Sequence, residues 1–159
     1  MKKSRIAASV MEVAMAIDYR CPKCRKSLYN AGTKKLLLKG MLTGKHFSAE
    51  SMFELNHQQE AFGGAPLVGN IKVEKGARVD FFCPHCGQDL TLALDEELSE
   101  ILHVDEKGAE QSFLFSKIAG REMSFLICKE RRELLGSYGK DHAEYLYRIH
   151  EFFNMWNRF

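Results

Sequence analysis

The stretch from residue 36 to residue 55 consists of an apolar segment followed by a segment in which apolar and polar residues alternate. The segment 36–42 is apolar and leads through Thr43, Gly44 and Lys45 into 46–55. Apolar residues in that second segment occupy alternate positions: Phe47, Ala49, Phe53 and Leu55. A period of two is typical of a strand with one buried face. The pattern therefore predicts a β-hairpin with a glycine-containing turn.

The same reasoning predicts two more hairpins. One covers 69–83 and turns at 74–76, and the other joins 112–118 to 123–129. A further short strand is expected at 90–94, where apolar residues again alternate with polar ones. The segment 57–70, rich in glycine and amide residues, is expected to be a loop.

Three segments have helical character. They are an N-terminal segment (1–18), an acidic segment (95–102) and a C-terminal segment that starts with Asp141 and Glu144 in capping-box spacing. The apolar residues of the last segment recur at helical intervals: Tyr145, Leu146, Ile149, Phe152, Phe153 and Trp156. This aromatic stripe, with Phe159 beyond it, indicates core packing or a surface for self-association or partner binding.

Together these elements predict an α+β fold in one domain, residues 1–159. Residues 1–18 form its N-terminal helix, and 19–94 form a β region. Residues 95–159 add the acidic helix, a hairpin and the C-terminal amphipathic helix. A chain of 159 residues is long enough to bury a core of its own.

The composition is that of a soluble protein, with 45% apolar and 28% charged residues. No apolar run approaches the ~20 residues that span a bilayer, so we expect no membrane partner. A basic start is followed by an apolar stretch from Ile6 to Ile17, but Glu12 interrupts this stretch and no cleavage-site pattern follows. We therefore expect a cytoplasmic protein.

Charge is unevenly distributed although the net charge is only +2. Residues 1–45 contain 11 Lys and Arg against 2 acidic residues, and residues 80–112 contain 1 against 9. The simplest interpretation is that the two segments lie side by side and neutralise each other.

Four of the five cysteines occur in two C-P-x-C motifs, Cys21 with Cys24 and Cys83 with Cys86. A disulfide framework is not expected in a reducing compartment. The C-x2-C spacing lets two thiolates of one tight turn occupy neighbouring corners of a tetrahedron, and two such turns close the coordination sphere of a metal ion. Proline presets each turn, and Gly87 allows the second chain segment to leave in a left-handed conformation.

These motifs, with the strand that precedes the second one (ARVDFFCPHCG), resemble the zinc-ribbon family. The resemblance implies a four-cysteine structural zinc site that organises a small antiparallel sheet. The chain departs from the family at Arg25, where glycine is common. It departs also in the 58 residues between the motifs, where ~15–20 are usual. Such an insertion costs little, because loop-closure entropy grows only logarithmically.

A faint repeat relates the two motifs. CPKCRKSL (21–28) and CPHCGQDL (83–90) share four positions at an offset of 62 residues. Outside these segments the copies do not align, so the sequence does not indicate a duplicated domain.

Other interpretations of the cysteines remain open. Iron also binds four thiolates, although rubredoxin-like domains are far shorter. A further alternative gives each motif its own metal ion with histidine ligands, for which His46, His57 and His103 are candidates. The segment FFCPHC also resembles the dithiol of thioredoxin-fold disulfide oxidases, which would make the chain a thiol–disulfide oxidoreductase. Those enzymes need a later cis-proline, and the last proline here is Pro84 within the motif.

No serine–histidine or paired-carboxylate pattern indicates catalysis, and Cys128 is expected to be a small core residue. Basic residues surround the first motif: Lys23, Arg25, Lys26, Lys34 and Lys35. They are either a solvated surface or a contact for nucleic acid. We expect a non-catalytic zinc-binding module that binds a protein, with nucleic acid as a second class of partner.

Overall fold

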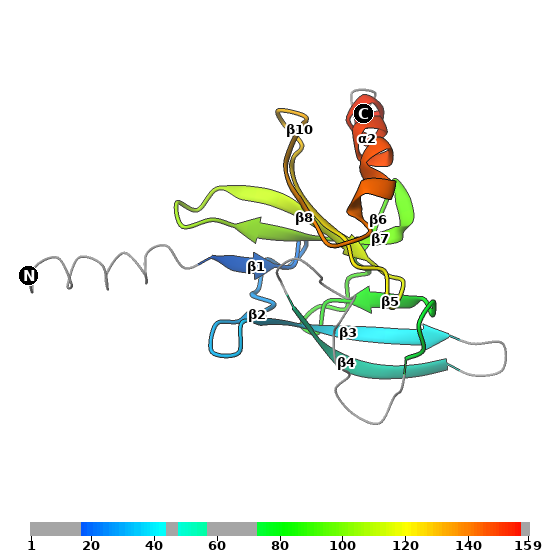
Figure 1. Ribbon diagram of the computed structural model, residues 1–159. Helices are drawn as coiled ribbons and strands as arrows, with labels where there is room; N and C mark the ends of the chain where they lie inside the picture. The colour runs from blue at the N-terminus through cyan, green and yellow to red at the C-terminus, as the bar shows by residue number, and fades with distance from the viewer. Residues whose placement is uncertain (1–16, 44–47, 57–72, 157–159) are drawn as a thin grey trace, which may run out of the picture.

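The computed structural model describes residues 17–43, 48–56 and 73–156. These residues form two antiparallel sheets and a C-terminal helix (Figure 1). The predicted α+β class is consistent with this arrangement. No helix in the described ranges is both long and apolar enough to cross a membrane.

The larger sheet has six strands, with β7 and β8 at its centre. Its main path runs β1-β7-β8-β9-β10, and β6 shares with β1 the edge of β7 that faces away from β8. The strands are β1 (Asp18–Arg20), β6 (Thr91–Leu92), β7 (Asp95–Val104), β8 (Glu110–Ser116), β9 (Ser124–Cys128) and β10 (Glu133–Tyr138). The antiparallel pair β8–β9 confirms the hairpin predicted at 112–129.

The smaller sheet has four strands and is built on β3. Its strands are β2 (Tyr29–Asn30), β3 (Lys35–Thr43), β4 (Ser48–Asn56) and β5 (Val79–Phe82). Strand β4 pairs with β3 along its whole length, which confirms the first predicted hairpin. Strands β2 and β5 follow one another along the opposite edge of β3.

Two apolar clusters divide the molecule into three layers. The first cluster lies between the sheets and contains Phe53 and Phe81 from the smaller sheet and Phe115 from the larger one. The second lies between the other face of the larger sheet and the C-terminal helix. The larger sheet is therefore covered on both faces, as Figure 1 shows.

The C-terminal helix begins as a 3-10 turn, His142–Tyr145, and continues as α2 (Leu146–Trp156). Phe152 and Phe153 are buried in the second cluster, so these two aromatic residues serve the core. The predicted capping box is wrong. The Asp141 carboxylate instead accepts a hydrogen bond of 2.9 Å from the Glu122 N–H and makes no capping bond.

The predicted acidic helix at 95–102 is also wrong, because these residues belong to strand β7. The spacing of Leu98, Ile101 and Leu102 is helical in the sequence. In the structure Leu98 packs in the cluster beneath α2, whereas Ile101 packs between the sheets. A strand that is covered on both faces need not alternate, since residues of either parity can be buried.

Two other predictions change at their boundaries. The N-terminal helix falls largely on residues 1–16, outside the described residues, but Asp18 belongs to β1 and not to a helix. In the second predicted hairpin the turn at 74–76 is present, with a 3.0 Å bond from the Ala77 N–H to the Glu74 carbonyl. Strand β5 that follows pairs with β3, and Val73 is not in a strand.

The structure extends the faint repeat far beyond the cysteine motifs. Each copy consists of a short strand, a cysteine turn, a second short strand and a long hairpin: β1 to β4 in the first, β5 to β8 in the second. Strands β2 and β6 are 62 residues apart, and so are the starts of β4 and β8. The leading strands are exchanged, because β1 pairs with β7 of the second copy and β5 pairs with β3 of the first.

Candidate metal centre

The four predicted cysteines converge on one point between the two copies of the repeat. Their sulfur atoms all lie within 4.8 Å of one another. The Sγ atoms of Cys21 and Cys86 are 3.7 Å apart, and so are those of Cys24 and Cys83. A tetrahedral ion with metal–sulfur bonds of about 2.3 Å requires sulfur atoms about 3.8 Å apart. The four cysteines are therefore able to hold one metal ion.

Both cysteine turns have the same backbone. The Lys23 N–H lies 3.3 Å from the Cys21 sulfur, and the His85 N–H lies 3.3 Å from the Cys83 sulfur. Each turn also closes with a 2.9 Å bond to the carbonyl of its first cysteine, from Arg25 in one and Gly87 in the other. Backbone N–H groups directed at sulfur stabilise the thiolate form that a metal requires.

The residue after each second cysteine has a left-handed backbone, with φ of 65° at Arg25 and 79° at Gly87. Glycine adopts this conformation without steric cost, whereas arginine adopts it at a steric cost. The absence of glycine after the first motif thus does not change the turn. The Arg25 guanidinium forms an ion pair with Glu110 of the second copy.

A second contact joins the turns directly. The His85 ring lies with Nε2 3.0 Å from the Ser27 carbonyl oxygen. Because a carbonyl only accepts, this nitrogen carries the proton and donates. The sequence places His85 within the second motif but gives no indication that its side chain contacts the segment that follows the first motif.

Burial differs sharply among the four thiols. Cys21 and Cys83 are buried, Cys24 is half-buried and Cys86 is exposed. Burial raises the pKa of the Cys83 thiol to about 12, and the backbone N–H of Gln88 is the main cause that lowers the pKa of Cys86 to about 7. Metal binding displaces the thiol protons, so the affinity of the centre must fall in acid.

The histidines considered as additional ligands do not join the centre within the described residues. His103 packs its ring edge-on against Tyr19, with the centroids 5.2 Å apart, and its Nδ1 lies 3.3 Å from Gln111 Oε1. His46 and His57 lie outside the described residues. The fifth cysteine, Cys128, is half-buried and lines a surface cavity, so the prediction of a core residue is not met.

The predicted neutralisation of the two charge blocks occurs only in part. Arg25 pairs with Glu110 across them. Among the described residues the other four basic residues near the first motif form no ion pair: Lys23, Lys26, Lys34 and Lys35. Three of these are exposed and Lys35 is half-buried, so a basic surface remains beside the metal centre.

Two cavities formed by described residues lie away from the sulfur cluster. One of about 550 Å³ is lined by the β7–β8 and β9–β10 hairpins, and one of about 330 Å³ lies near Lys75 and Asp141. Neither is lined by any of the four clustered cysteines.

Comparisons with protein-family models, with curated proteins and with solved structures found no match to this chain. Function has to be argued from the site itself.

Proposed function

We propose that this chain is a non-catalytic binding module whose two repeat copies are held together by a structural zinc ion. The convergence of Cys21, Cys24, Cys83 and Cys86 carries the proposal. Four protein thiolates fill a tetrahedral site and leave no position for a substrate, which is the pattern of structural rather than catalytic zinc. Zinc suits a structural role because it has no redox chemistry. Metal analysis of the purified chain distinguishes zinc from iron.

Thiol accessibility tests the proposal against the alternative, a thiol–disulfide oxidoreductase. In the metal-loaded chain we expect Cys128 to react with an alkylating reagent while the four clustered cysteines react only after chelation. The exposed Cys86 gives the most sensitive measurement, because only metal ligation would protect it. Rapid alkylation of Cys86 together with a reversible Cys83–Cys86 disulfide in the native chain would instead favour the enzyme.

A nucleic-acid contact at the first cysteine turn is a second proposal, supported by the basic residues that lack ion pairs. Exposed cations that face solvent bind phosphates in a salt-dependent way. We expect Lys23→Ala with Lys26→Ala to weaken binding of a random single-stranded oligonucleotide at low salt. The matched control is Lys75→Ala with Lys107→Ala, two exposed lysines elsewhere. Equal binding by both double variants, or none by the parent chain, would exclude this contact.

A further inference from the structure

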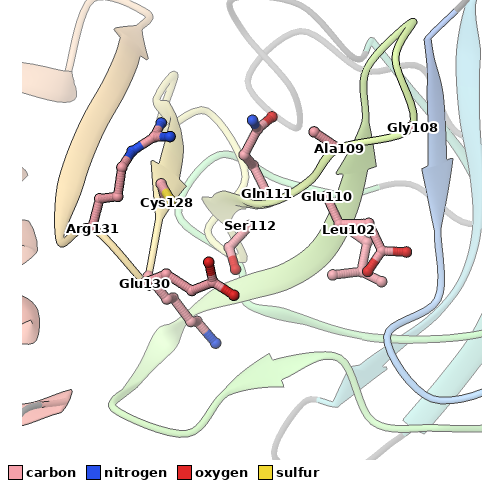
Figure 2. A pocket seen from close by; sticks show the side chains of 10 residues that line it. Leu102, Gly108, Ala109, Glu110, Gln111, Ser112, Cys128, Glu130 and Arg131 are labelled. Carbon is pink, nitrogen blue, oxygen red and sulfur yellow. The ribbon is translucent and has the colours of Figure 1, made fainter.

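The cavity of about 550 Å³ occupies a fork in the larger sheet. In Figure 1 the β7–β8 hairpin and the β9–β10 hairpin leave the body of the sheet in different directions. Figure 2 shows the space between them, with Gly108 and Ala109 on one side and Cys128 and Arg131 on the other. Its volume is within the range of protein ligand pockets.

The fork exists because the ladder between β8 and β9 stops early. The two strands pair from Ser112 with Ile127 to Phe115 with Ser124. Beyond that point Glu110 and Gln111 pair only with β7, and Cys128 pairs only with Glu133 of β10. A continued ladder would have placed Gln111 opposite Cys128, and the cavity lies there instead.

Each arm of the fork therefore has a short strand edge without a partner among the described residues. Alternate residues of a strand direct their backbone N–H and C=O groups to opposite edges. One residue of the pair Glu110 and Gln111 thus presents these groups to the fork. Unpaired strand edges bind extended peptide, because its backbone supplies the missing hydrogen bonds.

Charge in the fork is balanced except at one residue. Glu110 pairs with Arg25, and Arg131 pairs with Glu133 at 3.0 Å. Lys129 lies 2.5 Å from Glu100, which also accepts a 2.7 Å bond from the Ser112 hydroxyl. Glu130 is exposed and, of the charged residues that line the cavity, it alone has no ion pair in the described part of the chain. The uncompensated charge favours a basic group on the occupant and disfavours nucleic acid.

We propose that the fork binds an extended peptide segment of a partner protein, which pairs with the open strand edges and places a basic side chain near Glu130. This inference rests on the proposed binding function and specifies its partner. The basic surface at the first cysteine turn is not part of the fork.

The test is selection of random decapeptides displayed on phage against the full, metal-loaded chain. We expect enriched sequences that contain Lys or Arg and bind with micromolar affinity. Ala109→Trp, at an exposed position on the rim, should weaken the selected peptide at least tenfold. The matched control Ala143→Trp, at an exposed position on the 3-10 turn, should bind it unchanged. Glu130→Gln should weaken binding several-fold and reduce its salt dependence.

Two further measurements use the parent chain, so they test the inference even if a variant folds poorly. A selected peptide N-methylated at alternate residues should lose binding to the parent chain, since it cannot form strand hydrogen bonds. Hydrogen exchange of the parent should slow at Glu110, Gln111 or Cys128 when the unmodified peptide is present. Failure to enrich any peptide, unchanged binding after N-methylation, or protection elsewhere would overturn the inference. Failure of the proposed function would appear separately, as a reactive dithiol in the alkylation experiment.

Discussion

Gly40 shows how tightly a single position is constrained between the sheets. A Cβ atom there would lie 2.5 Å from the Phe53 ring and 2.9 Å from Val79 Cγ1. Both neighbours are fully buried, so neither is able to move away freely. We expect Gly40→Ala to lower the free energy of unfolding by about 1–3 kcal/mol.

Chemical denaturation measures this loss. Gly32→Ala is the control, because that turn glycine is exposed and its new Cβ would meet only the Asn30 side chain. The control should stay within about 0.5 kcal/mol of the parent. Equal losses in the two variants would contradict the packing described for Gly40.

His103 makes stability depend on pH. Burial lowers the pKa of this imidazole, and the nearby Asp105 and Glu106 oppose the shift only in part. The unfolded chain then binds the proton more readily than the folded one, so the stability contributed by neutral His103 is lost as the pH falls below about 6.5. A metal ion bound by the four cysteines would be released in acid as well, so a comparison between variants is needed.

The comparison uses His103→Phe, which keeps a ring against Tyr19. Between pH 7 and pH 5 we expect the melting temperature of this variant to fall less than that of the parent. Any contribution from metal binding would be common to both proteins and would cancel. Parallel curves would show that His103 is not a source of the pH dependence.

The four clustered cysteines were predictable from the sequence, because the spacing within each C-x2-C motif determines their chemistry. The C-x2-C motifs identify four cysteines that the structure brings together, whatever the length of the chain between them. The ion pair of Arg25 with Glu110 and the bond from His85 to Ser27 were not predictable. Both depend on how the two repeat copies face each other, and no local pattern encodes that.

At the scale of elements, Lys117 joins the two sheets just beyond the end of β8. Its ammonium is 2.6 Å from Asp80 on β5 and 2.7 Å from the Thr91 hydroxyl on β6. The Lys117 side chain is 1% exposed, whereas Asp80 is 40% exposed. Removing the carboxylate would leave a buried charge without its counter-ion, which is more costly than removing the charge itself.

We therefore expect an asymmetry between two substitutions. Asp80→Asn should lower the free energy of unfolding by about 2–3 kcal/mol, less than for a fully buried pair because Asp80 is partly solvated. Lys117→Met should cost about 1 kcal/mol or less, since it replaces the ammonium with an apolar group of similar length. Denaturant titration of both variants tests this, and a larger loss for Lys117→Met would contradict it.

The hairpin β8–β9 was predicted although both of its faces are covered, whereas strand β7 of the same sheet was not predicted as a strand. The segment of strand β4 alternates between apolar and polar residues, because only one face of the hairpin β3–β4 packs in the core between the sheets. Strand β7 lies between the smaller sheet and α2, so Leu98 and Ile101 are buried on opposite sides. Glutamates of β7 form hydrogen bonds with residues distant in the sequence. For example, Glu97 accepts a 2.6 Å hydrogen bond from the Tyr145 hydroxyl. Such tertiary contacts override the helical preference of DEELSEIL.

At the scale of the whole molecule, the exchange of β1 and β5 makes each repeat copy depend on the other. Neither copy has its complete sheet without a strand from its counterpart. The sulfur cluster takes one cysteine pair from each copy and lies directly after both exchanged strands. A metal ion there would hold both exchanged strands in place, so chelation should lower the melting temperature of the chain in one cooperative transition.

The sequence did not reveal this organisation because the two copies differ in composition. The first copy is basic and the second is acidic, and only the cysteine turns retain the shared residues. What the copies share elsewhere is the order and pairing of their strands, whose starts are offset by 60 to 62 residues. Many sequences satisfy one pattern of backbone hydrogen bonds, so the repeat is visible in the structure and not in an alignment.

The central claim is that one metal ion is bound by all four cysteines of the two turns. X-ray absorption at the metal edge of the purified chain measures this directly, since it gives the element and the number and distance of the sulfur neighbours. The account predicts zinc with four sulfur neighbours at about 2.3 Å. A chain that contains no metal, or a metal with nitrogen or oxygen among its ligands, would contradict it.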